Sequence, residues 1–77
     1  MSVKDKVRDQ LAEYLGRSPD KVPYESPLTD LVSDSFRLVE IAIELQEDFN
    51  VRLVQDDLKT VRTVDDLAEL IASRQVA

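Results

Sequence analysis

The amino-acid sequence predicts an all-α fold, a small four-helix bundle of three longer helices and one short one. Three segments carry apolar residues three and four positions apart, the spacing of a helix with one buried face, and no segment alternates as a half-buried strand does. The chain has 77 residues, a length suited to one hydrophobic core. We therefore expect a single domain over residues 1–77.

The first predicted helix covers about residues 2–15. The Ser2 hydroxyl can cap its free N–H groups, and Asp5 favours the positive end of its dipole. Gly16 suits the left-handed conformation that often follows a helix. We expect this helix to be structural, because acids and bases mix on its solvent side. Its apolar face consists of Val3, Val7, Leu11, Tyr14 and Leu15.

A long loop is predicted over residues 16–33, where Pro19, Pro23 and Pro27 interrupt any helical period. Loops longer than about 12 to 15 residues are uncommon in small domains unless they have a purpose. We expect this one to let the first and second helices run roughly parallel. The apolar residues expected to hold it to the core are Val22, Tyr24, Leu28 and Leu31.

The second predicted helix covers about residues 35–49 and has three surfaces. Its core side carries Leu38, Ile41, Ala42, Leu45 and Phe49. A charged side carries Arg37, Glu40, Glu44, Glu47 and Asp48. Between them lies a marginal apolar edge of Phe36, Val39 and Ile43, separated from the core side by Gln46. Asn50 can end the helix in a left-handed conformation.

Two further helices complete the predicted bundle. Asp56 and Asp57 favour a short third helix over about residues 56–61. Thr63 and Asp66 match a capping box, with Asp in place of Glu, at the start of a last helix over about residues 64–74. The apolar face of that helix consists of Val64, Leu67, Ala68 and Ile71.

Composition narrows the classes of function. The sequence has no histidine and no cysteine, so the usual general base, a thiolate nucleophile and the commonest metal ligands are missing. We expect neither enzymatic activity nor a metal site. No apolar run approaches the roughly 20 residues of a membrane span, and the charged N-terminus lacks a signal-peptide core. We expect a cytoplasmic protein with no membrane partner.

The net charge of −6 is concentrated in the second half of the chain. Such a field repels nucleic acid and attracts proteins with basic patches, so we expect no nucleic-acid partner. The alternative is a charged surface that only keeps the protein soluble. Stability does not explain the charged side of the second helix, because Glu40 and Glu44 repel each other one turn apart. Arg37 also opposes the helix dipole in the first turn.

Asp34 and Ser35 stand at the start of the second helix. Taken alone, such a pair is a common helix cap. With its surroundings, however, the pair resembles the Asp-Ser-Leu phosphopantetheine attachment motif and recognition helix of acyl carrier proteins. The residues that carry this resemblance are Leu31-Val32-Ser33-Asp34-Ser35-Phe36, Val39, Glu40, Leu45 and Phe49. It continues through Leu53, Asp56-Asp57, Val61 and Thr63-Val64, and so covers nearly the whole chain.

The resemblance implies a non-catalytic carrier with an acyl-carrier-protein-like fold. Ser35 would receive 4′-phosphopantetheine from coenzyme A, with Asp34 as part of the motif, and acyl groups would ride on the terminal thiol as thioesters. A phosphodiester in the first helical turn lies at the positive end of the dipole, which stabilises an anion by typically about 0.3–1 kcal/mol.

The implied partners are a phosphopantetheinyl transferase and acyltransferase, adenylating or ketosynthase-type enzymes with basic docking patches. The carrier itself is expected to be a monomer. The residues at the matching docking positions are Phe36, Val39, Glu40, Ile43, Glu44 and Glu47, with Arg37 as a discriminating residue.

Three departures from the family pattern bear on the pathway. Phe36 replaces the commoner leucine, Val32 replaces the usual glycine, and Arg37 stands where fatty-acid carriers often have an acid. Asp34 favours an acyl carrier over a peptidyl carrier. Our hypothesis is a free-standing carrier in polyketide or hybrid polyketide/nonribosomal peptide biosynthesis. The alternatives are a fatty-acid carrier and an unmodified acidic helical interaction module.

Overall fold

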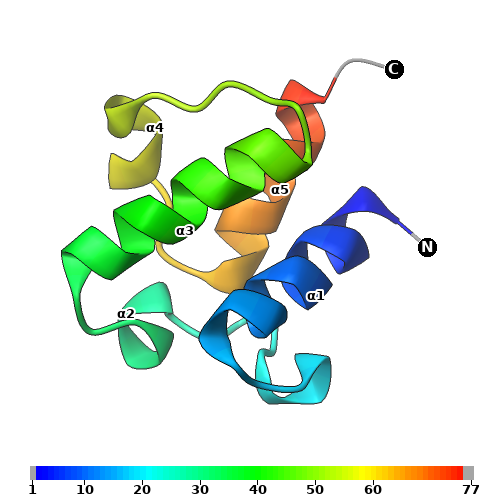
Figure 1. Cartoon of the computed structure of the whole chain (residues 1–77), viewed down its shortest axis with the longest axis vertical. Coiled ribbons are helices and arrows are strands. Elements are labelled where there is room, and N and C mark those ends of the chain that lie inside the picture. The colour runs from blue at the N-terminus through cyan, green and yellow to red at the C-terminus, as the bar shows by residue number, and fades with distance from the viewer. Residues whose placement is uncertain (1, 76–77) are drawn as a thin grey trace.

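Helices of very different length make up the fold, which we describe for residues 2–75 in a computed structural model (Figure 1). The elements are α1 (Val3–Leu15), the 3₁₀ helix η1 (Pro19–Lys21), α2 (Leu28–Leu31), α3 (Ser35–Asp48), α4 (Gln55–Lys59) and α5 (Val64–Arg74). Residues 2–75 contain no β-strand, only a single bridge pair between Pro27 and Thr63. The three longer helices and the short one before the last are confirmed, although α4 begins and ends slightly earlier than predicted.

Local side-chain chemistry starts and ends the longer helices as the sequence predicts. The Ser2 hydroxyl accepts the N–H of Asp5 at 3.2 Å, and Gly16 ends α1 at φ 69°. At the start of α5, the Thr63 hydroxyl accepts the N–H of Asp66 at 3.1 Å, and the Asp66 carboxylate accepts the N–H of Thr63 at 3.2 Å. This reciprocal pair is the predicted capping box.

The core lies where α1, α3 and α5 meet. The fully buried side chains include Val7, Leu11, Ile41, Leu45, Leu67 and Ile71. They come from the apolar faces that the helical period predicts. Leu38 and Phe49, also expected on the core side of α3, pack against this core but are only half-buried. Within the described residues, no helix has the length and apolar content to cross a membrane.

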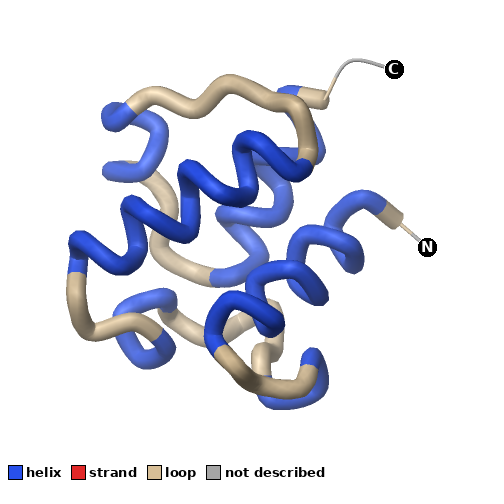
Figure 2. Tube along the Cα trace, viewed as in Figure 1, coloured by secondary structure: helices blue, strands red, loops and turns tan. Residues whose placement is uncertain are grey.

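The predicted loop over residues 16–33 is wrong in one respect, because it contains η1 and α2 (Figure 2). Pro27 stands just before α2, where its fixed φ suits a helix start. Each helical piece is one turn, too short to produce a detectable apolar period. As predicted, Val22 and Leu28 are buried in the core, and Tyr24 and Leu31 pack against it.

Backbone hydrogen bonds fasten the same connection to the start of α5. The N–H of Leu28 donates to the Arg62 carbonyl at 2.8 Å, and the N–H of Asp65 donates to the Tyr24 carbonyl at 2.9 Å. The Tyr24 hydroxyl also donates to Asp5 in α1. Partial burial and this hydrogen bond raise the pKa of Tyr24 to about 12. The connection is therefore an ordered part of the fold.

The relative direction of α1 and α3 also differs from the prediction. Figure 1 shows the two helices running in opposite senses, not roughly parallel. The guanidinium of Arg37, in the first turn of α3, donates to the Tyr14 carbonyl near the end of α1 at 3.0 Å. The chain thus returns close to the point where it left α1. The connection over residues 16–33 was expected to span the length of the bundle, but η1 and α2 coil part of it into short helical turns.

Candidate functional site

Asp34 and Ser35 have different roles at the start of α3. Asp34 is the helix cap, since its carboxylate accepts the N–H of Phe36 at 2.9 Å. Ser35 is the first residue of the helix, and its side chain is exposed. Within residues 2–75, the Ser35 hydroxyl makes no hydrogen bond. The cap interpretation therefore holds for Asp34 and leaves Ser35 accessible.

The position of Ser35 suits a negatively charged group. The first turn of α3 presents unpaired backbone N–H groups and the positive end of a dipole built from 14 residues. An anion attached to the Ser35 oxygen would lie at this end. The site can therefore hold a phosphodiester that projects into solvent.

An apolar surface lies beside this site. Phe36 is 79% exposed, Val39 36% and Ile43 49%, which confirms that the predicted edge of the second helix faces solvent. Val54, just before α4, is 55% exposed and is a residue that the sequence reasoning missed. A single apolar residue in a loop produces no periodic signal.

The charged side of α3 is exposed as well. Glu40, Glu44 and Glu47 face solvent, and none of them pairs with a cation within 4 Å in the described part of the chain. Asp48 is different, because its carboxylate accepts a hydrogen bond from the Tyr14 hydroxyl. That bond raises the pKa of Tyr14. Three of the four acids on this side thus have no role within the described fold.

Arg37 has a structural contact that the sequence did not reveal. Its side chain is exposed, yet it donates to the Tyr14 carbonyl in the last turn of α1. A cation there is favoured by the negative end of the α1 dipole. Because Tyr14 also bonds Asp48, this one residue joins α1 to both ends of α3.

A groove of about 200 Å³ separates α3 from the segment that leads into α4. Its lining is mostly apolar and consists of Val39, Ala42, Ile43, Gln46, Leu53, Val54 and Leu58. We call it the α3–α4 groove. Gln46 fixes its far wall, since its side-chain oxygen accepts the N–H of Leu53 at 2.7 Å. The sequence showed Gln46 only as a break in the apolar pattern.

These features define a class of protein, a small helical domain that presents an accessible serine at a helix start beside apolar and acidic surfaces. A family model described as a phosphopantetheine attachment site matches residues 5–71. Curated relatives agree with that match. The acyl carrier protein of Chlamydia trachomatis is 37% identical over 76 residues, covering 97% of this chain and 99% of the relative.

Two further relatives give the same result. The acyl carrier protein of Bdellovibrio bacteriovorus is 33% identical and covers 96% of both chains, and that of Nitratidesulfovibrio vulgaris is 33% identical, covering 97% of this chain and 100% of the relative. The chain therefore belongs to the acyl carrier protein family. Its cofactor is covalently attached 4′-phosphopantetheine, and the family is one of non-catalytic carriers.

Proposed function

We propose that Ser35 carries the phosphopantetheine and that this protein presents acyl thioesters to partner enzymes. The observation that carries the proposal is the division of roles at the start of α3, where Asp34 caps the helix and leaves the Ser35 hydroxyl exposed. The family model spans this position, and the helix dipole favours the phosphodiester there.

We further propose a docking surface for the transferase and for acyl-handling enzymes with basic patches. Its apolar part is Phe36, Val39 and Ile43, and its acidic part is Glu40, Glu44 and Glu47. Two observations support it: the acids lack partners among the described residues, and large apolar side chains beside them stay exposed. Exposed apolar patches of this kind often mark interaction sites. Arg37 lies at the border of this surface.

The pathway is a separate proposal. Of the three departures from the family pattern, Val32 is buried in the core and Arg37 contacts α1, so both have reasons within the fold. Only Phe36 remains as a signal of unusual partners. It favours polyketide or hybrid pathways, whereas the relatives are named only as acyl carrier proteins, which leaves fatty-acid biosynthesis as the alternative. A cytoplasmic location also stays a prediction.

Modification by a broad-specificity phosphopantetheinyl transferase and coenzyme A tests the role of Ser35. Intact-mass measurement should show one added group on the wild type and on Ser33→Ala, the control at a neighbouring exposed serine, and none on Ser35→Ala. An unmodified wild type would favour the plain interaction module. Modification of the Ser35→Ala variant would show that another residue is the attachment site.

A further inference from the structure

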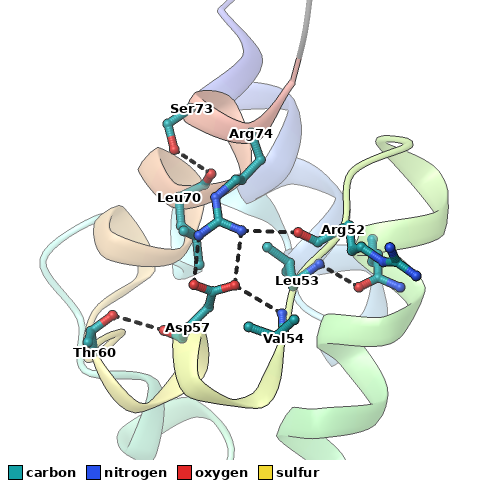
Figure 3. A network of polar contacts seen from close by, with 9 residues as sticks. Arg52, Leu53, Val54, Asp57, Thr60, Leu70, Ser73 and Arg74 are labelled. Atoms are coloured by element: carbon teal, nitrogen blue, oxygen red, sulfur yellow. Dashed lines mark hydrogen bonds and ion pairs between the residues drawn. The ribbon is translucent and has the colours of Figure 1, made fainter.

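One polar network fastens α4 and the loop before it to the end of α5 (Figure 3). The Arg74 guanidinium donates to both carboxylate oxygens of Asp57, at 2.7 and 3.0 Å, and to the Arg52 carbonyl at 3.2 Å. Asp57 in turn accepts the N–H of Val54 at 2.9 Å. We call the pair of Asp57 and Arg74, with these two backbone contacts, the α4–α5 latch.

The latch is stronger than an ordinary surface ion pair. Its two-pronged geometry gives two parallel charge-assisted hydrogen bonds, and the Asp57 side chain is only 15% exposed. The Arg74 guanidinium and the Val54 N–H hold the pKa of Asp57 below its usual value. By contrast, Lys59 and Asp56 make a single 3.3 Å contact between side chains that are mostly exposed, the kind of pair that contributes little.

The segment that the latch holds is one wall of the α3–α4 groove. Leu53, Val54 and Leu58 form that wall, and they lie within or beside the residues that the network joins. When Arg74 is not bonded to Asp57, this ion pair no longer joins α4 to the last turn of α5. This wall is therefore held in two places, at Leu53 by Gln46 inside the groove and at Val54 and α4 by the latch outside it.

The opposite wall lies in line with Ser35. The α3 residues that line the groove are Val39, Ala42, Ile43 and Gln46. They follow Ser35 by four, seven, eight and eleven positions, the spacing of one helical face. A second apolar groove, of about 480 Å³, contacts α3 only at Leu38. A flexible arm on Ser35 can therefore reach the α3–α4 groove along this face of α3.

The chemistry and size of the α3–α4 groove suit a short apolar group. A chain lying there would cover Val39, Ile43 and Val54, each of which is now at least 36% exposed. Each methylene group that such a chain removes from water favours binding in the groove. An apolar cavity of about 150 Å³ holds a benzene ring, so a groove of about 200 Å³ has room for a short acyl chain or one ring.

We propose that the α4–α5 latch determines which acyl groups this carrier shelters. With Arg74 bound to Asp57, α4 stays close to α3 and the groove accepts short acyl chains. With the latch open, α4 moves away from α3 and longer chains enter. The inference rests on the proposed carrier function of Ser35, whereas the latch itself is a property of the unmodified protein.

Hydrogen exchange in the unmodified protein tests the latch without any cargo. Arg74→Gln should speed exchange at the backbone amides of residues 53–59 by about five- to tenfold while leaving those of α1 and α3 unchanged. Lys59→Gln is the control. It also removes one positive charge but breaks only the exposed pair with Asp56, so it should change the exchange rates of these amides little. Equal exchange in wild type and Arg74→Gln would overturn the latch.

Thioester protection tests the effect on cargo. Wild type and Arg74→Gln are loaded by a transferase with a series of acyl-coenzyme A substrates from acetyl to dodecanoyl, and cleavage by hydroxylamine is timed. The wild type should protect butanoyl and hexanoyl groups best, and the variant should extend protection several-fold to octanoyl and longer chains. Identical length profiles would overturn the role in cargo selection. Failure of both proteins to load would count against Ser35, and the exchange result would still decide the latch.

Discussion

Two neighbouring residues at the start of α3 illustrate how one side chain can free another for function. Asp34 supplies the cap that the helix needs, so the Ser35 hydroxyl has no structural task among the described residues. Arg37, two residues further on, has a structural role instead. The sequence predicts that its charge destabilises α3, whereas the structure shows its side chain bonded to the Tyr14 carbonyl at the end of α1.

Charge reversal at Arg37 separates these two interpretations of its role. From the sequence alone, Arg37→Glu would stabilise α3, since an acid suits the first turn. Because the substitution also breaks the bond to Tyr14 and puts an acid at the negative end of α1, we expect a net loss of a few tenths to about 1 kcal/mol. Urea denaturation measures it. A stability gain would show that the contact to Tyr14 contributes nothing.

At the scale of helices, local patterns predict where elements lie but not how they connect. The caps of α1 and α5 involve residues three apart, so Ser2 with Asp5 and Thr63 with Asp66 were visible in the sequence. The one-turn pieces η1 and α2 have no period to detect. The direction of α1 relative to α3 depends on contacts between distant residues, such as Arg37 with Tyr14, which no local pattern encodes.

The α5 capping box should be sensitive to acid. Hydrogen bonds from the N–H groups of Arg62 and Thr63 hold the pKa of Asp66 below its ordinary 3.8. A depressed pKa in the folded state means that the stabilisation is complete above the unfolded pKa and is lost as the pH falls through the folded value. Asp66→Asn should therefore be less stable than wild type at pH 7, and the gap should narrow near pH 3. A gap that does not change with pH would contradict this origin.

The acidic side of α3 should act through association with partners. Reversing both Glu40 and Glu44 to Lys should slow acyl transfer by a cognate enzyme, with the loss in association rate shrinking as salt is raised. Reversal of the exposed Glu13 and Glu25 makes the same change in net charge away from α3 and serves as the control. Equal rates of acyl transfer for both double variants would show that the acidic side of α3 is only a solvated surface.

At the scale of the whole molecule, a chain of 77 residues depends on few core side chains for stability. Leu45 is fully buried between the three long helices. Leu45→Ala should cost about 2–5 kcal/mol, comparable with the whole stability of so small a domain. Circular dichroism should show a largely unfolded variant, while Phe49→Ala at a half-buried position should lose less and Ser35→Ala should match wild type. A collapse of Ser35→Ala would make that residue structural.

Peptide mapping of the modified protein locates the cofactor most directly. Cleavage on the N-terminal side of aspartate releases residues 34–47, a peptide in which Ser35 is the only hydroxyl side chain. The neighbouring peptide, residues 30–33, contains Ser33 as an internal control. We predict that the whole mass of one phosphopantetheine appears on the peptide from Asp34 to Glu47. An unmodified 34–47 peptide from a protein that has gained the cofactor would contradict Ser35 as the carrier residue.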